Sequence, residues 1–141
     1  MVIPETAASL GLEPHPEGGW FRRIYTSRLG VATDAGERPT ATCIHYLLTP
    51  GDESAWHVVT SDELWLWHGP GTLELALGGD STGPSGNPTL VRLGGKVAEG
   101  EVPACLVPAN TWQAARLAGA EECLVSCMVS PGFDFADWRL A

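Results

Sequence analysis

The chain alternates short apolar runs with turn residues and shows little helical periodicity. The apolar runs are rich in β-branched and aromatic residues, and glycine, proline, serine or asparagine separate them. Such runs are typical of β-strands bounded by turns. This pattern predicts strands at residues 22–27, 40–48, 55–60, 63–68, 72–77, 89–93, 104–107, 113–117 and 122–129.

Helix signals are few and short. Only residues 4–10 and the tail at residues 134–140 favour a helix. Because no helix of crossover length separates the strands, a parallel α/β sheet is disfavoured. Residues 78–88 (GGDSTGPSGNP) predict a long exposed hairpin loop, and residues 30–39 predict a second flexible connector. We therefore expect an all-β sandwich or barrel that forms a single domain over residues 1–141.

Composition limits the partners and the compartment. The net charge is −9, which repels phosphate backbones and anionic lipid, so we expect neither a nucleic acid nor a membrane as partner. The absence of a long apolar stretch and of a basic N-terminal leader favours a cytoplasmic protein. The four cysteines form no CxxC pair and lie in strand-like runs, which predicts buried thiols rather than disulfides or a zinc site.

Residues 51–71 carry the candidate chemistry. Strand alternation places His57 on a face with Val59, and it places Glu63 on a face with Trp65 and Trp67. If the two strands pair antiparallel, His57 and Glu63 converge inside a barrel that the tryptophans line. A buried imidazole and carboxylate in contact make an acid/base pair or part of a metal site. The alternative is a histidine and a glutamate on an ordinary strand surface.

Two segments resemble the paired barrel motifs of the cupin superfamily. They are residues 51–71 and residues 107–114 (VPANTWQA). In the first motif, the glycine, first histidine, second histidine and glutamate positions hold Gly51, His57, Val59 and Glu63. In the second motif, the proline, glycine and histidine positions hold Pro108, Asn110 and Gln113. The substitution by asparagine is mild, because asparagine tolerates left-handed backbone angles.

Four sequence blocks extend the resemblance along nearly the whole chain. They are HPEGG at residues 15–19, the SxxHxxxSDExW block at 54–65, VPAxTW at 107–112 and PGFDFxDW at 131–138. Their order is similar to that in a cupin subgroup related to the yeast YML079w protein. The resemblance implies a double-stranded β-helix, the RmlC-like cupin jelly-roll barrel, with short peripheral helices. It also implies a homodimer with one small-molecule cavity in each subunit.

The resemblance bears on metal binding as well. A typical metal-binding cupin supplies three imidazoles and one carboxylate, whereas this chain keeps His57 and Glu63, has valine at the second histidine position and offers only an amide at Gln113. This set has too few strong ligands for tight transition-metal binding, so we expect no metal cofactor. A weakly bound divalent ion on His57, Glu63 and Gln113 remains the alternative.

A metal-free site needs another source of chemistry. Similarity to the deoxysugar epimerases implies His57 as general base, oriented by Glu63, with Tyr46 as acid. The expected ligand-binding residues are Trp65, Trp67, Gln113, Glu17, and Arg22 or Arg23, since alternation directs one of these arginines inward to bind a carboxylate or phosphate. The alternative interpretations are a surface salt bridge for the arginine and a turn-stabilising role for Glu17.

Three functions compete at this point. The first is a metal-independent isomerase or epimerase acting on a polar or sugar-like substrate. The second is a non-catalytic metabolite-binding cupin, and the third is a metal-dependent cupin oxygenase or lyase. Separately, the exposed sheet edges of a small jelly roll favour a homodimer, in which an extended N-terminal segment adds to the partner's sheet.

Overall fold

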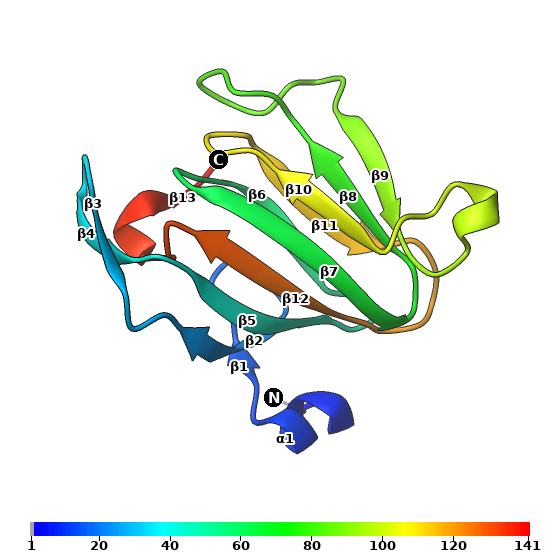
Figure 1. Cartoon of the computed structure of the whole chain (residues 1–141). Helices are drawn as coiled ribbons and strands as arrows, with labels where there is room; N and C mark the ends of the chain where they lie inside the picture. The colour runs from blue at the N-terminus through cyan, green and yellow to red at the C-terminus, as the bar shows by residue number, and fades with distance from the viewer. Residues whose placement is uncertain (1) are drawn as a thin grey trace.

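Two antiparallel sheets face each other and form the body of the molecule (Figure 1). The computed structural model describes residues 2–141. The six-stranded sheet has the order β1 (Glu13–Pro14), β2 (Trp20–Thr26), β5 (Thr42–Leu48), β12 (Cys123–Ser130), β7 (Asp62–Pro70) and β10 (Ala104–Val107). The five-stranded sheet has the order β13 (Trp138–Leu140), β6 (Glu53–Val59), β11 (Gln113–Leu117), β8 (Leu73–Leu77) and β9 (Thr89–Leu93). This arrangement confirms the expected all-β fold.

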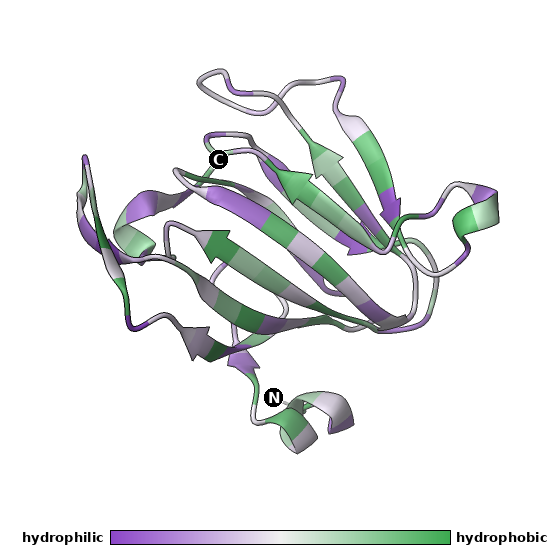
Figure 2. Cartoon of the chain, in the orientation of Figure 1, coloured by the Kyte–Doolittle hydropathy of each residue, from purple (hydrophilic) through white to green (hydrophobic). Residues whose placement is uncertain are grey.

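The core lies between the two sheets. Alternate residues of the strands face inward, and polar and apolar bands alternate most clearly along β7 (Figure 2). The largest fully buried side chains include Trp65, Tyr46, Leu73, Leu75 and Leu93. The predicted thiols fit this picture, because all four cysteines are free, and Cys43, Cys123 and Cys127 are buried.

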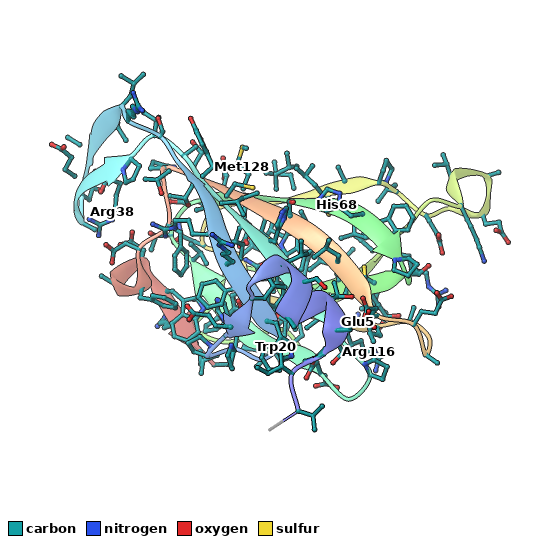
Figure 3. The ribbon with its side chains drawn as sticks, turned by 90° about the horizontal axis from the view of Figure 1, so that it is seen from below. Glu5, Trp20, Arg38, His68, Arg116 and Met128 are labelled. Atoms are coloured by element: carbon teal, nitrogen blue, oxygen red, sulfur yellow. The ribbon has the colours of Figure 1, made fainter. Side chains whose placement is uncertain are left out.

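A short N-terminal helix covers one end of the six-stranded sheet. Helix α1 (Glu5–Leu10) confirms the helix expected at residues 4–10. Its buried Ala7 packs with Leu12 against Trp20 and Leu47, and Trp20 lies beside the helix in Figure 3. Strand β1 then pairs with β2 of the same chain. In this subunit the N-terminal segment therefore completes its own sheet.

Two segments differ from the sequence expectation. Residues 30–39 are not a loose connector but a hairpin of β3 (Gly30–Thr33) and β4 (Gly36–Pro39), and Gly36 supplies a positive φ of 121° at the turn. The C-terminal tail is not an α-helix: a 3-10 turn, η2 (Phe135–Asp137), leads into β13, which pairs with the edge of β6. Edge pairing with β6 satisfies backbone groups of the tail that a short isolated helix would leave exposed to water.

The remaining connections are short or exposed. Residues 78–88 join the antiparallel strands β8 and β9 without forming a strand, which confirms the predicted hairpin loop. A second 3-10 turn, η1 (Val97–Glu99), connects β9 to β10. Within residues 2–141, no helix has the length and apolarity needed to cross a membrane.

The central segment folds differently from the expected hairpin. Strands β6 and β7 follow each other in sequence but belong to different sheets and do not pair. As expected, His57 and Val59 are buried on β6, although Val58 between them is buried as well, and Glu63 and Trp65 are buried on β7. His57 and Glu63 therefore approach each other across the barrel, from facing sheets, rather than as neighbours within one sheet.

Candidate functional site

A small cavity opens between the two sheets beside the C-terminal segment. Its volume is about 50 Å³. The polar and charged side chains that line it are those of His15, Glu17, Arg23, Thr42, His57, Glu63 and Cys127. The rest of the lining is apolar or aromatic and comes from Phe21, Ile44, Val59, Val129, Phe133, Phe135 and Trp138. A few polar groups converging in an apolar hollow are typical of small-molecule sites.

The HPEGG turn brings Glu17 into this cavity. The amide of Gly18 donates to the carbonyl of His15 at 3.0 Å, and both glycines of the turn have positive φ, 108° at Gly18 and 75° at Gly19. A Cβ on Gly18 would lie 1.9 Å from the carbonyl oxygen of Glu53, so only glycine lets the turn pack against β6. The amide of Ala55 in turn donates to the carbonyl of Glu17 at 2.8 Å.

Glu17, rather than Glu63, is the direct partner of His57. The Oε2 atom of Glu17 lies 2.6 Å from Nδ1 of His57 and accepts a hydrogen bond from Ser54 Oγ at 2.9 Å. The same Nδ1 also lies 2.7 Å from the carbonyl oxygen of Ala55. Because both neighbours of Nδ1 are acceptors, this atom carries a proton, and the neutral ring has its free lone pair on Nε2. Among the described residues, none is a hydrogen-bond partner of Nε2.

The pKa values of this pair follow from burial and charge. Burial disfavours both charged forms, but the ionic contact and the hydrogen bond between Glu17 and His57 outweigh it. The pKa of Glu17 is consequently lowered, and the pKa of His57 is raised, with a smaller contribution from the charge of Glu63. Glu17 therefore holds a proton on His57.

His15 adds a second imidazole to Glu17. Its Nδ1 accepts from the amide of Glu17 at 3.1 Å, and its Nε2 lies 3.2 Å from Glu17 Oε1. A neutral ring with the hydrogen on Nε2 satisfies both contacts. Burial lowers the pKa of His15, and the charge of Glu17 only partly offsets this effect. His15 therefore supports the carboxylate as a neutral donor.

Glu63 reaches the cavity from the opposite sheet. Its Oε1 accepts from Gln113 Nε2 at 2.9 Å, and Gln113 Oε1 accepts from Trp65 Nε1 at 2.8 Å. Burial raises the pKa of Glu63 to about 7, although the charge of His57 and the hydrogen bond from Gln113 act in the other direction. The thiol of Cys127 also lines the cavity, and burial together with the charge of Glu63 raises its pKa well above the usual range. Cys127 is therefore an uncharged part of the lining and not a nucleophile.

Four of the predicted site residues lie outside the lining of the cavity. Tyr46 donates its hydroxyl to the carbonyl of Gly18 at 2.5 Å, and burial followed by the charge of Glu17 raises its pKa well above the usual range. Trp65 and Gln113 form the hydrogen-bond chain behind Glu63, and Trp67 donates to the carbonyl of Gly71 at 2.8 Å. These contacts favour roles in positioning Glu63 and in packing. They do not favour Tyr46 as the acid, because its hydroxyl is already bonded to Gly18 and lies outside the cavity lining.

The two arginines point to different places, as alternation predicts. Arg23 lines the cavity and donates through Nη2 to the carbonyl of Phe133 at 3.0 Å. Arg22 contacts the carbonyl of Leu10 at 3.4 Å, beside helix α1. The inward arginine is therefore Arg23.

The aromatic wall comes from the PGFDFxDW block at residues 131–138. The rings of Phe133 and Phe135 lie 4.9 Å apart, those of Phe135 and Trp138 lie 5.5 Å apart, and both contacts are edge-to-face. Trp65 and Trp67, which we expected to line the cavity, lie in or against the core, and Trp56 lies on the outer face of the five-stranded sheet. No binding role was predicted for His15, Phe21 or the PGFDF block, although His15 and the PGFDF block belong, like Glu17, to the four ordered sequence blocks, which was the available signal.

The side chains do not fit a transition metal. In the part of the chain that the structure describes, no group of three histidine, cysteine, aspartate or glutamate side chains is placed to hold a metal ion. Gln113 uses its amide oxygen for Trp65, and His57 uses Nδ1 for Glu17 and Ala55. The candidate set His57, Glu63 and Gln113 therefore retains one free imidazole nitrogen and one carboxylate, which is short of the three protein ligands of a typical open site.

A larger hollow of about 530 Å³ lies on the outer face of the five-stranded sheet. Its lining includes Trp56, Leu90 and the ion pair of Arg116 with Glu74, and it contains none of the buried titratable groups described above. The larger volume favours this hollow as a binding site, but a pKa near neutral pH is typical of a catalytic acid or base, and Glu63, with a pKa of about 7, lies in the smaller cavity.

Comparison with known proteins decides the family. Residues 4–141 match the family described as Cupin superfamily (DUF985). The chain belongs to this cupin family. No curated protein matches the chain.

Solved structures extend the comparison. A hypothetical protein from Leishmania major is 31% identical with a TM-score of 0.87, over 96% of this chain and 84% of that one. A protein from Shewanella oneidensis is 34% identical with a TM-score of 0.87, over 97% and 82% of the two chains. A variant of the oxalate decarboxylase of Bacillus subtilis is 16% identical with a TM-score of 0.63, and the match covers 91% of this cupin but 29% of that enzyme. The last likeness shows the double-stranded β-helix fold alone.

Proposed function

We propose that this cupin binds a small polar molecule and moves a proton on it without a metal, as an isomerase or epimerase does. One observation carries the proposal. His57 and Glu63 reach the same cavity from facing sheets, and the pKa of each is raised, that of Glu63 to about 7. Groups that titrate near neutral pH are the best general acids and bases there.

The two groups complement each other in proton transfer. Glu17 holds a hydrogen on Nδ1 of His57, so proton exchange with a ligand takes place at Nε2. When the pair holds a single exchangeable proton, it exists either as imidazolium with carboxylate or as imidazole with carboxylic acid. In one direction His57 acts as the base and Glu63 as the acid, and in the other direction the roles exchange. An isomerase requires this reversibility.

The cavity limits the size of the substrate. A volume of about 50 Å³ does not enclose a nucleotide sugar, so the reacting part of the ligand is small. The finer placement in the subgroup related to the yeast YML079w protein rests on the four ordered sequence blocks, and that subgroup has no firmly shared activity. The proposal therefore depends on the geometry of the site.

Deuterium exchange tests the proposal across a panel of candidate substrates. Short hydroxy and oxo acids and small aldoses are incubated with the protein in D₂O, and loss of the carbon-bound proton signal is followed by ¹H NMR. His57→Asn retains a donor toward Glu17 but removes the Nε2 position, and Glu63→Gln retains an acceptor toward Gln113. We expect both variants to lose at least about 100-fold in exchange rate, whereas His68→Asn, at an exposed histidine on β7, retains it.

A compound that binds in the cavity but exchanges at the rate of the protein-free solution would favour the second candidate, a non-catalytic metabolite-binding cupin. Exchange that survives in His57→Asn would remove His57 from the mechanism.

A further inference from the structure

We propose that the ligand of this cavity is a short monocarboxylate whose carboxylate group binds Arg23. This inference rests on the proposed function, because it concerns the substrate class of the same site. It assigns to Arg23 the role of selecting charge, separate from the proton transfer by His57 and Glu63.

The position of Arg23 suits an anchor at the cavity. Arg23 lies in register with Ile44 of β5, which also lines the cavity. Arg23 is exposed, and its Nη2 donates to the carbonyl of Phe133, which holds the guanidinium at the aromatic wall, where the cavity opens. A guanidinium has five N–H donors in a planar fork, so this single bond leaves the rest of the fork available. Such a fork matches the two oxygens of a carboxylate.

Arg23 and Trp138 leave hydrogen-bond donors available in the site. Both oxygens of Glu17 are occupied by His57, His15 and Ser54. The indole N–H of Trp138, another residue of the lining, is buried and has no partner between residues 2 and 141. A buried donor without a partner is rare and indicates an acceptor still to be supplied. An ionised carboxylate accepts hydrogen bonds only, so it complements this set.

The charge balance points the same way. The charges of Glu17 and His57 cancel within their ion pair, and Glu63, with a pKa of about 7, is only partly ionised near neutral pH. Arg23 is then the cation that no carboxylate among the described lining residues neutralises directly. The local field therefore favours a monoanion, although the net charge of the whole chain is −9.

Size and lining define the rest of the ligand. At about 50 Å³ the cavity holds roughly four water-sized positions, which is room for a chain of only a few carbon atoms. The walls beyond Arg23 are apolar side chains such as Ile44, Val59 and Val129. A phosphate group would place two charges against a single arginine and would leave several of its oxygens against these apolar walls.

Binding of propionate and of its neutral analogue propionamide tests the inference. The indole N–H signal of Trp138 in a ¹H–¹⁵N NMR spectrum, assigned with Trp138→Phe, reports on the cavity. We expect propionate to shift this signal with an affinity at least about 10-fold higher than that of propionamide. Arg23→Gln should abolish the preference, whereas the matched control Arg22→Gln should retain it, because Arg22 is exposed like Arg23 but contacts the carbonyl of Leu10 beside α1.

Three binding results would overturn the inference. They are equal binding of propionate and propionamide, an equal loss in both arginine variants at unchanged melting temperature, and tighter binding of inorganic phosphate than of propionate. The outcome is separable from that of the proposed function. Charge-selective binding without deuterium exchange would support the carboxylate site and contradict catalysis. Exchange on a neutral aldose that Arg23→Gln leaves unchanged would contradict the carboxylate site alone.

Discussion

Glu63 is the residue whose environment has the largest consequence for pH dependence. Its pKa in the folded protein is raised from 4.5 to about 7, chiefly by burial. Between pH 4.5 and about pH 7, the folded state therefore keeps a proton on Glu63, whereas the unfolded state has already released it. By linkage, the contribution of Glu63 to stability is complete below pH 4.5 and is lost as the pH rises through about 7.

We expect this loss to amount to about 3 kcal/mol of unfolding free energy, because one pKa unit corresponds to about 1.4 kcal/mol. Urea unfolding between about pH 5 and pH 8 measures it. Glu63→Gln should flatten the decline over this range, and Glu53→Gln, at an exposed glutamate on β6, should not. An identical pH dependence in wild type and Glu63→Gln would mean that Glu63 titrates like a solvated carboxyl group.

At the residue scale, the sequence predicted which side chains reach the site better than it predicted which of them contact each other. His57, Glu63, Glu17 and an inward arginine were all identifiable from alternation and from the motif positions, and Asn110 does adopt a left-handed φ of 63°. The partner of His57 was not predictable, because it comes from a turn 40 residues earlier, as the numbering shows. Tyr46 as the acid stays a prediction that its hydrogen bond to the carbonyl of Gly18 does not support, since a resemblance gives the position of a residue but not the acceptor that its hydroxyl reaches.

At the scale of elements, the C-terminal segment covers the cavity. Asp134 caps η2 by accepting from the amide of Ala136 at 2.8 Å. Arg38 of β4 binds both carboxylate oxygens of Asp137, at 2.8 Å and 3.1 Å, and Arg38 lies beside this turn in Figure 3. A bidentate arginine–carboxylate contact is well defined in geometry. The β3–β4 hairpin therefore holds the aromatic wall in place.

Removing this clamp should loosen the segment without unfolding the sheets. In Asp137→Asn we expect the amides of β13 to exchange with solvent at least about 10-fold faster, because local opening requires less free energy. Hydrogen-exchange mass spectrometry or NMR measures the effect. Glu74→Gln, which removes the exposed ion pair with Arg116, is the matched control and should leave β13 unchanged. Equal protection of β13 in Asp137→Asn and wild type would show that the clamp is not needed.

The element scale also shows where sequence reasoning stops. Runs and turns located most strands, but they could not tell that β6 and β7 join different sheets. A short connection is compatible both with a hairpin and with a crossing between sheets. The tail at residues 134–140 was misread as a helix, because its pairing partner β6 lies far away in the sequence.

At the scale of the molecule, the outer face of the six-stranded sheet is only partly covered. Helix α1 packs over the end that carries Trp20 and Leu47. Farther along, Leu106 and Met128 are exposed, and Figure 3 shows Met128 and His68 along this sheet. An apolar sheet face of this kind is a common contact surface between subunits.

We expect the protein to be a homodimer that uses this face. Analytical ultracentrifugation at micromolar concentration should give a dimer for the wild type and a monomer for Met128→Glu. Leu90→Glu, at an exposed leucine of the other sheet, should remain dimeric. A wild-type monomer under these conditions would contradict the expectation of a dimer, and a dimer that persists in Met128→Glu would place the contact elsewhere.

The most direct measurement is an NMR titration of the Glu63 carboxyl carbon, with His57 followed in the same samples. The proposed mechanism requires the carboxyl group to titrate at about pH 7 and the imidazole to respond at the same pH, because the two groups share one cavity. A Glu63 pKa near 4.5, with an imidazole that does not sense it, would mean that the pair cannot exchange a proton with a ligand near neutral pH, and the proposed chemistry would be wrong.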